Sequence, residues 1–237
     1  MASNLSGKVA IVTGGTRGIG RAIAERLLAE GASVAVCSRS RENVQAFVKE
    51  CKDSADRLLA EPADMSKLDD VRAFFAKVDE RFGGVDVLVN NAGIGVFKST
   101  ADLTPEEWHR TIDLNLNGVF YCSHEALPRM KKRGGGYIIN ISSLAGKNPF
   151  AGGAAYNASK FGLNGFSEAM MLDHRHDNVR VSYVMPGSVD TDFGPRAGAA
   201  SWKIQSEDIA EVVMMLLRMP ERTLVSRVEI RPSKPPK

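Results

Sequence analysis

Short apolar runs rich in β-branched residues alternate along this chain with longer segments in which apolar residues recur at helical spacing. The short runs predict strands at residues 9–13, 33–37, 57–61, 87–90, 137–141, 180–184 and 225–230. The longer segments predict helices at residues 19–30, 41–52, 66–82, 105–132, 156–174 and 206–218. We therefore predict an α/β fold, a doubly wound parallel sheet of about seven strands with helices on both faces.

The chain is predicted to form one domain over residues 1–237, because no repeat and no linker divides it. Two stretches lack regular spacing, residues 146–155 and residues 187–205. We interpret them as walls of a site, with residues 187–205 as a compact substrate lid. The tail at residues 231–237 holds three prolines and is predicted to be loosely ordered.

The composition, 43% hydrophobic and 25% charged residues, is typical of a soluble globular protein. The longest uncharged stretch, residues 134–146, is short and glycine-rich, whereas a bilayer span needs ~20 apolar residues. The first residues lack the basic and apolar segments of a secretory signal. We therefore expect a cytoplasmic protein with no membrane partner.

The charges are nearly balanced, with 31 basic against 28 acidic residues, and are mixed along the chain. Nucleic acid is therefore not an expected partner. One basic run, residues 131–133, lies at the end of a predicted helix, where cations stabilise the carbonyl end of the helix. Docking of an acidic partner is the alternative explanation of this run. The three cysteines are widely spaced and are expected to be reduced, and no metal site is expected.

A glycine-rich turn separates the first predicted strand from the first predicted helix. Gly14 permits a tight turn, Gly18 lets the backbone approach a phosphate, and Gly20 lets helix and sheet pack closely. The N-terminus of the helix favours the negative charge of that phosphate. The turn predicts a Rossmann-like dinucleotide site. The alternative is a loop in which the glycines only allow the backbone conformation and no ligand binds.

The turn belongs to a series of motifs that occur in order along the chain. They are Thr13 with the G-x-x-x-G-x-G spacing of the turn, Asn90-Asn91-Ala92-Gly93, Asn115, Ser143 thirteen residues before Tyr156, Tyr156-Asn-Ala-Ser-Lys160, and Pro186-Gly187. With these motifs the chain resembles the short-chain dehydrogenase/reductase family over residues 7 to about 232.

Tyr156 and Lys160 lie four residues apart on a predicted helix and therefore share a face. A nearby ammonium favours phenolate, so we expect the pKa of Tyr156 to fall below its ordinary value of about 10. The resemblance implies that Tyr156 transfers the proton, Ser143 positions the substrate oxygen, Lys160 also binds the nicotinamide ribose, and Asn115 holds the lysine and a water. Ser143 as a turn residue and Asn115 bonded to local backbone are the plainer alternatives.

The end of the second predicted strand indicates which cofactor binds. An acidic residue there would bond the ribose of NAD, but Ser38 stands in that place. Arg39 follows it, and Arg17 lies in the glycine turn, so two guanidiniums can hold a 2′-phosphate. We predict NADP(H). The cofactor site implied by the resemblance comprises Gly14, Thr16, Arg17, Gly18, Ile19, Gly20, Ser38, Arg39, Asp64, Met65, Asn91, Ala92, Gly93, Tyr156, Lys160, Pro186, Gly187, Val189 and Thr191.

The predicted function is NADPH-dependent reduction of a ketone or aldehyde, a small-molecule carbonyl, to an alcohol. We expect a mostly apolar substrate side formed by residues 94–97 and 144–150 with Val189, Phe193 and Trp202. A carrier-protein 3-ketoacyl reductase and a sepiapterin-type reductase are alternatives that the resemblance leaves open. Asp177 stands where carrier-protein reductases place an arginine, which disfavours carrier docking.

A non-catalytic NADPH-binding regulator is the alternative from another class. It is disfavoured because Asn115, Ser143, Tyr156 and Lys160 are all present. The many apolar residues at 161–172, together with the resemblance, predict a homodimer or homotetramer built on the two longest predicted helices, 105–132 and 156–174.

Overall fold

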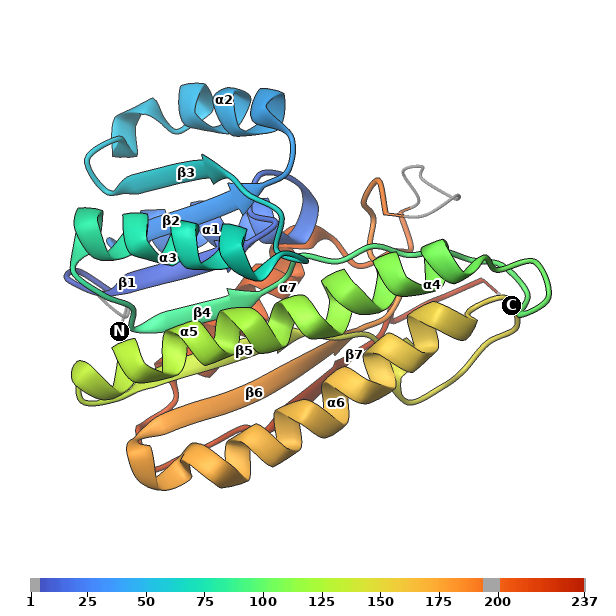
Figure 1. The fold of residues 1–237 in the computed structure, drawn as a ribbon. Coiled ribbons are helices and arrows are strands. Elements are labelled where there is room, and N and C mark those ends of the chain that lie inside the picture. The colour runs from blue at the N-terminus through green and yellow to red at the C-terminus, as the bar shows by residue number, and fades with distance from the viewer. Residues whose placement is uncertain (1–4, 194–200, 237) are drawn as a thin grey trace.

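A computed structural model describes residues 5–193 and 201–236, and its strands form one parallel sheet (Figure 1). The seven strands have the order β3-β2-β1-β4-β5-β6-β7. They are β1 Val9–Thr13, β2 Ser33–Ser38, β3 Leu58–Pro62, β4 Val87–Asn90, β5 Gly136–Ile141, β6 Val179–Pro186 and β7 Arg227–Ile230. The order reverses between β1 and β4, so the predicted doubly wound sheet is confirmed.

The helices lie on both faces of this sheet, with α3, α5 and α6 in front of it in the view of Figure 1 and α1 and α7 behind it. Their bounds are α1 Gly18–Ala29, α2 Arg41–Glu50, α3 Leu68–Phe82, α4 Pro105–Ile112, α5 Gly118–Lys132, α6 Ala154–His174 and α7 Ser206–Arg218. Short 3-10 turns lie at Lys52–Ser54, Leu144–Gly146 and Arg175–Asp177, and a π-helical turn lies at Asp113–Asn117.

Alternate strand residues belong to two separate cores. Successive side chains of a strand point to opposite faces, so Val12 packs with the residues of α1 and α7 while its neighbour Ile11 packs with those of α3 and α5. The same division continues through the middle of the sheet, at Val36, Val89 and Ile139 on one side and Ala35, Leu88 and Ile138 on the other. These central strands are therefore apolar on both faces, which explains their uninterrupted apolar runs.

The helix predicted at residues 105–132 is confirmed in its bounds, but its pitch is not uniform. A Thr104–Glu107 capping box starts α4, but a π-helical turn at Asp113–Asn117 separates α4 from α5. A π turn holds an extra residue and re-aims the side chains around it. Here it includes Asn115, which is only 1% exposed and hydrogen-bonds residue Ile94 on a neighbouring segment.

The predicted lid is described in part. An isolated bridge pairs Val189 with Ile204, and the Asp190 N–H donates to the Ile204 carbonyl, so the two ends of the segment lie together. Residues 194–200 of the predicted lid, and residue 237 of the predicted tail, lie outside the described residues. Residues 231–236 belong to neither helix nor strand.

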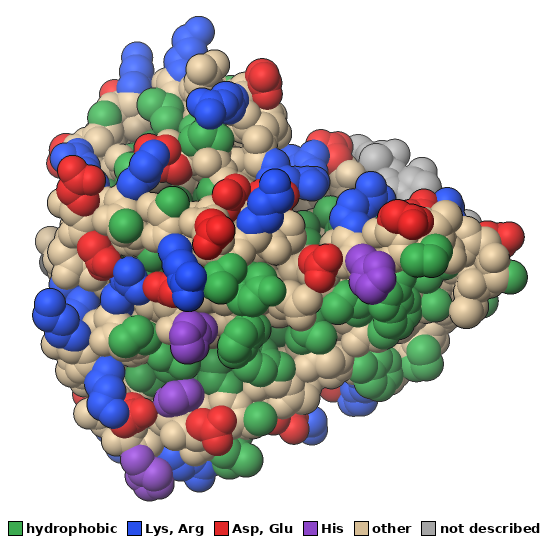
Figure 2. Space-filling model, in the orientation of Figure 1, with side chains coloured by type: hydrophobic (Ala, Val, Ile, Leu, Met, Phe, Trp, Pro, Cys, Tyr) green, Lys and Arg blue, Asp and Glu red, His purple; other side chains and the backbone are tan. Residues whose placement is uncertain are grey.

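Large apolar side chains remain exposed on the helices. Phe120 of α5 is 48% exposed and Leu172 of α6 is 56% exposed. Figure 2 shows hydrophobic side chains gathered over the face that these helices cover. Among the described residues, none of the helices combines the length and apolar character required to cross a bilayer.

Candidate active site

The glycine turn between β1 and α1 has the geometry that its sequence predicts. Gly14 and Gly18 adopt left-handed backbone angles, with φ of 63° and 51°. A Cβ on Gly14 would lie 3.0 Å from the Cα of Ala92, and a Cβ on Gly20 would overlap the Gly14 carbonyl oxygen. Gly20 therefore allows close packing against the turn itself. Gly15, which sequence reasoning missed, is the glycine that packs on the sheet, because its Cβ would lie 2.6 Å from Val36.

Polar groups in this turn are available to an anion. The hydroxyl of Thr16 is buried and has no hydrogen-bond partner among the described residues. Helix α1 lacks a side-chain cap at Arg17 and has no acidic residue in its first turn. The first backbone N–H groups of a helix have no intrahelical acceptor and carry partial positive charge. The turn, including Ile19, therefore fits a pyrophosphate.

Arg39 follows Ser38 at the end of β2, and Arg17 lies in the glycine turn between β1 and α1. Arg39 and Arg17 are both exposed, and neither forms an ion pair with the part of the chain that the structure describes. Ser38 ends the strand opposite Pro62, so no carboxylate stands at the strand end itself. Both arginines are free to pair with a phosphate.

The side chains of three predicted cofactor-binding residues contact other residues of the chain. Asn91 donates its amide to the carbonyls of Thr13 (3.0 Å) and Gly14 (3.2 Å). The Asp64 carboxylate accepts bonds from the N–H and hydroxyl of Ser66. Met65 is buried, 3.5 Å from the sulfur of Cys122. These contacts set the shape of the turn and of the segment after β3.

The segment after β6 reaches back to the glycine turn. Gly187 follows Pro186 and donates its N–H to Ile230 at the end of β7. Thr191 lies beside Gly18, since a Cβ on that glycine would be 3.4 Å from the Thr191 methyl group. The structure thus brings the segment that holds Val189 and Thr191 next to the start of α1.

Ser143, Tyr156 and Lys160 come together at the carboxyl edge of β5. Tyr156 lies in the first turn of α6, and Ser143 hydrogen-bonds its side chain. Ser143 begins the 3-10 turn at Leu144–Gly146, where its oxygen also accepts from the N–H of Ala145. Lys160 is buried, 2.9 Å from the carbonyl oxygen of Ile141, and its Nζ lies 5.7 Å from the centre of the Tyr156 ring.

Burial dominates the protonation of this group. It raises the pKa of Tyr156 above its ordinary value, while the hydrogen bond from Ser143 acts in the opposite direction. Burial also lowers the pKa of Lys160 to about 8. The predicted fall in the Tyr156 pKa is therefore wrong for this geometry, because the Lys160 ammonium is bonded to Ile141 rather than to the phenol.

Asn115 lies beside Tyr156 but does not directly bond Lys160 in this structure. Its amide oxygen accepts from the Ile94 N–H and its nitrogen donates to the Ile94 carbonyl, both at 2.9 Å. The same nitrogen donates to Ser159 Oγ, which donates to the carbonyl of Tyr156. The amide thus joins the Asn91-Ala92-Gly93 segment to the first turn of α6.

Two asparagines of α6 that sequence reasoning missed hold the segment around Ser143. Asn157 donates to the carbonyl of Ala145, and Asn164 donates to that of Gly146 while accepting from Ser142. The spacing of Asn157, Lys160 and Asn164, three and four residues apart, puts them on one face of the helix and was the available signal. The engagement of Ser142 leaves Ser143 as the serine that faces Tyr156.

Two phenylalanines contact the ring of Tyr156, and a third contacts one of them. The ring of Phe97 lies 5.5 Å and that of Phe193 5.7 Å from the tyrosine ring, and Phe150 lies 5.8 Å from Phe97. Trp202, also expected here, makes no ring contact with them in the described part of the chain.

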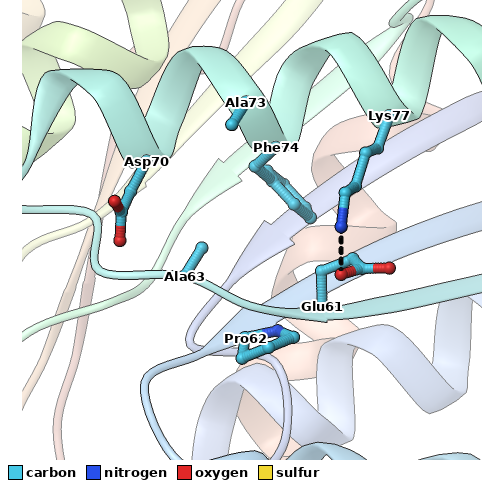
Figure 3. Close-up of a pocket in the computed structure, with 7 residues that line it drawn as sticks. All are labelled: Glu61, Pro62, Ala63, Asp70, Ala73, Phe74 and Lys77. Carbon is cyan, nitrogen blue, oxygen red and sulfur yellow. Dashed lines mark hydrogen bonds and ion pairs between the residues drawn. The ribbon is translucent and has the colours of Figure 1, made fainter.

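A different pocket lies between β3 and α3 at the edge of the sheet (Figure 3). Glu61 and Lys77 line it and form an ion pair of 2.6 Å, and Asp70 and Phe74 lie on α3 above it. Ser143, Tyr156 and Lys160 are not among the residues that line this pocket. Among the described residues, no cluster of three or more His, Cys, Asp or Glu side chains has a geometry that suits a metal ion.

Comparison with known proteins gives several matches. A family model described as short chain dehydrogenase matches residues 8–201. A 3beta-hydroxysteroid dehydrogenase of Mediterraneibacter gnavus is 38% identical over 193 residues, 81% of this chain and 70% of that protein. A putative ketoacyl reductase of Streptomyces coelicolor is 40% identical over 207 residues, 86% of this chain and 77% of that protein. The crystal structure of a metagenomic short-chain oxidoreductase in complex with NADP is 39% identical, with a TM-score of 0.86 over 98% of this chain and 100% of that one.

The packing of Gly20 predicts opposite effects for two glycine substitutions. Gly20→Ala forces a methyl group onto the Gly14 carbonyl and is expected to lower the free energy of unfolding by about 1–3 kcal/mol. Gly165→Ala, in the exposed middle of α6 with nothing within 4 Å, is the matched control and should raise it by about 0.5–1 kcal/mol. Urea unfolding of both variants measures the difference, and similar effects would contradict the packing described for the turn.

Proposed function

Since this chain belongs to the short-chain dehydrogenase family, we propose that it uses NADP(H) to reduce a ketone or aldehyde to an alcohol, with Tyr156 as the proton donor. One observation carries the proposal. The Tyr156 phenol, the Ser143 hydroxyl and the buried Lys160 ammonium meet at the carboxyl edge of β5, and the Asn115 amide joins them to the segment beside the glycine turn. The carboxyl edge of a parallel sheet, where the strand order reverses, is where such folds bind ligands.

The residues divide the proton chemistry among them. The reduced nicotinamide, when bound, supplies the hydride that adds to the carbonyl carbon. Ser143 donates a hydrogen bond to the carbonyl oxygen, and Tyr156 transfers its phenolic proton to the same oxygen as the carbon–oxygen double bond becomes a single bond. Because the pKa of Tyr156 is raised, the phenol holds its proton at neutral pH and is ready to act as an acid. Lys160 stabilises the phenolate that remains.

NADP(H) fits the residues of the glycine turn and of the end of β2. The Thr16 hydroxyl and the start of α1 suit the pyrophosphate, and Arg17 and Arg39 suit the 2′-phosphate. Ser38 leaves that phosphate without a repelling carboxylate at the strand end. The related metagenomic enzyme was crystallised with NADP.

The apolar face of α5 and α6 supports a homodimer or homotetramer. Phe120 of α5 and Phe166 of α6 bring their rings to 6.2 Å, and Phe161 and Leu172 of α6 are exposed. Large exposed apolar areas mark interaction sites. A second copy of the chain is the partner we propose for this face.

Replacement of the phenol tests the assigned chemistry. Tyr156→Phe is expected to lower kcat by about 10²–10⁴-fold, since a general acid contributes that much, while the Kd for NADPH changes little. Tyr183→Phe, which removes a hydroxyl bonded to Glu168 away from the site, is the control and should keep its activity. Activity of Tyr156→Phe within tenfold of the parent would contradict the assignment, and an inactive parent would favour a non-catalytic NADPH-binding protein.

The lowered pKa of Lys160 predicts the pH profile of reduction. Below pH 8 the ammonium is charged and supports the developing phenolate; above it the charge is lost while the phenol itself remains protonated. The expected kcat/KM for reduction is therefore level to about pH 8 and falls at higher pH. A profile that stays level to pH 10 would show that the ammonium contributes nothing to the rate.

Cofactor preference tests the role of Arg39. Arg39→Ala should weaken NADPH binding by about 1.5–3 kcal/mol, the range for hydrogen bonds to charged groups, and leave NADH almost unchanged. Ser38→Asp with Arg39→Ala should shift the preference further toward NADH, because the new carboxylate repels the phosphate. The quantity to compare is the ratio of kcat/KM for NADPH and NADH at one ionic strength. A parent that prefers NADH would refute the assignment.

The oligomeric state tests the apolar face. Light scattering at micromolar concentration should give the mass of a dimer or tetramer, and Phe120→Asp should lower that mass by placing a charge in the contact. Val48→Asp, at an exposed apolar position on α2, is the control and should leave the mass unchanged. A monomeric parent would contradict the proposal.

A further inference from the structure

Three aromatic rings from three different segments meet beside the phenol of Tyr156. Phe97 follows β4, Phe150 follows β5 and Phe193 follows β6, and we call these three the aromatic cluster. Phe97 lies edge-on to Tyr156 at 69° and contacts Phe193 at 6.5 Å and Phe150 at 5.8 Å. Edge-to-face and tilted contacts at these separations are favourable for aromatic rings.

The backbone leaves room for these rings at two glycines. A Cβ on Gly95 would lie 2.6 Å from the tip of Phe97 and 3.0 Å from Phe193. A Cβ on Gly153 would lie 2.7 Å from the ring of Phe150. A larger residue at Gly95 would push Phe97 or Phe193 away from Tyr156, and one at Gly153 would displace Phe150 from the cluster.

Core packing does not account for the cluster. Phe150 and Phe193 remain 46% and 44% exposed, although Phe150 packs on Phe97 and Phe193 packs on both Phe97 and the partly buried Tyr156. The cluster therefore keeps a large apolar surface open, and Phe193 keeps its part of it next to the proton donor. That surface is suited to a flat apolar group attached to the reacting carbonyl.

The charges on the same segments disfavour an anionic substrate. The cations at residues 94–98, 144–153 and 187–193 are Lys98 and Lys147. Lys98 is paired with Glu107 at 2.6 Å, and Lys147 with Glu229 at 2.7 Å. Asp192, exposed directly before Phe193, adds negative charge. An acidic carrier protein or a substrate carboxylate would find no unpaired cation on these described segments.

We propose that the substrate is an uncharged ketone or aldehyde with a flat ring system beside the carbonyl, held by the aromatic cluster, and not an acyl thioester delivered by an acidic carrier. The inference rests on the proposed carbonyl reduction and specifies its substrate class. The cluster supplies ring contacts, and Tyr156 and Ser143 act on the oxygen.

A pair of ketones with one carbon skeleton isolates the contribution of the rings. In 2-tetralone one ring is aromatic and not conjugated with the carbonyl, and in 2-decalone it is saturated. The parent enzyme should have the higher kcat/KM for 2-tetralone. Phe97→Leu and Phe193→Leu should each lower the ratio of the two values by about two- to tenfold, the range for one aromatic contact. Phe82→Leu, on α3 outside the cluster, is the matched control and should leave the ratio unchanged.

A binding measurement separates recognition from turnover. Titration calorimetry of 2-tetralone into Tyr156→Phe should show a Kd that rises by the same two- to tenfold factor when Phe193→Leu is added. Binding unaffected by Phe193→Leu would overturn the role of the ring even if the rates changed.

A small dicarbonyl and a carrier-bound substrate complete the test. Reduction of 2,3-butanedione, which is too small to cover the rings, is expected in the parent and in the control variant Phe82→Leu. If the parent reduces it but shows no preference for 2-tetralone, or if acetoacetyl acyl carrier protein is the better substrate, the inference fails while the proposed function stands. If the parent reduces none of these carbonyls, the proposed function itself fails.

Discussion

Hydrogen bonds from two side chains join the ends of β1 and β4, and the rest of the site depends on them. The ladder between these strands runs only to Val12 and Val89, so the backbone beyond it needs another support. Thr13 Oγ1 accepts from the N–H groups of Asn91 and Ala92, and the Asn91 amide donates to the carbonyls of Thr13 and Gly14. The glycine turn and the segment after β4 are thereby fixed to each other at the reversal of the strand order.

The same connection continues to Tyr156. The segment after β4 leads to Ile94, whose N–H and carbonyl are both bonded to Asn115, and Asn115 reaches the Tyr156 carbonyl through Ser159. That asparagine lies in the π-helical turn, whose extra residue re-aims the side chains around it. On the other side of the tyrosine, Asn157 and Asn164 hold the segment that carries Ser143. Asn115 therefore acts on Tyr156 by positioning the backbone of its helix.

Sequence patterns reveal the elements of this fold more fully than they reveal these bonds. The apolar runs predict every strand, and most plainly the central ones, which are buried on both faces, whereas β3 and β7 at the edges are only partly buried. The glycine spacing predicts the turn because Gly14 and Gly18 need left-handed angles. The π-helical turn escapes such reasoning, since helical periodicity assumes one uniform pitch. The roles of Asn157 and Asn164 escape it for another reason. A polar residue in a helix reads as surface until the carbonyls that it meets, 12 and 18 residues away, are known.

Two groups of the proposed site reduce the stability of the fold. Lys160 is buried against a single carbonyl, and its pKa of about 8 lies below the ordinary 10.5, so the folded chain holds this proton less well than the unfolded chain does. Stability from this group therefore rises as the pH increases from about 8 toward 10.5, and burial of the ammonium is unfavourable at neutral pH. The buried Thr16 hydroxyl adds a second unfavourable group. Two apolar cores, one on each face of the sheet, offset both. A ligand that bonds the ammonium and the hydroxyl would relieve these costs, so binding and folding favour the same arrangement of the site.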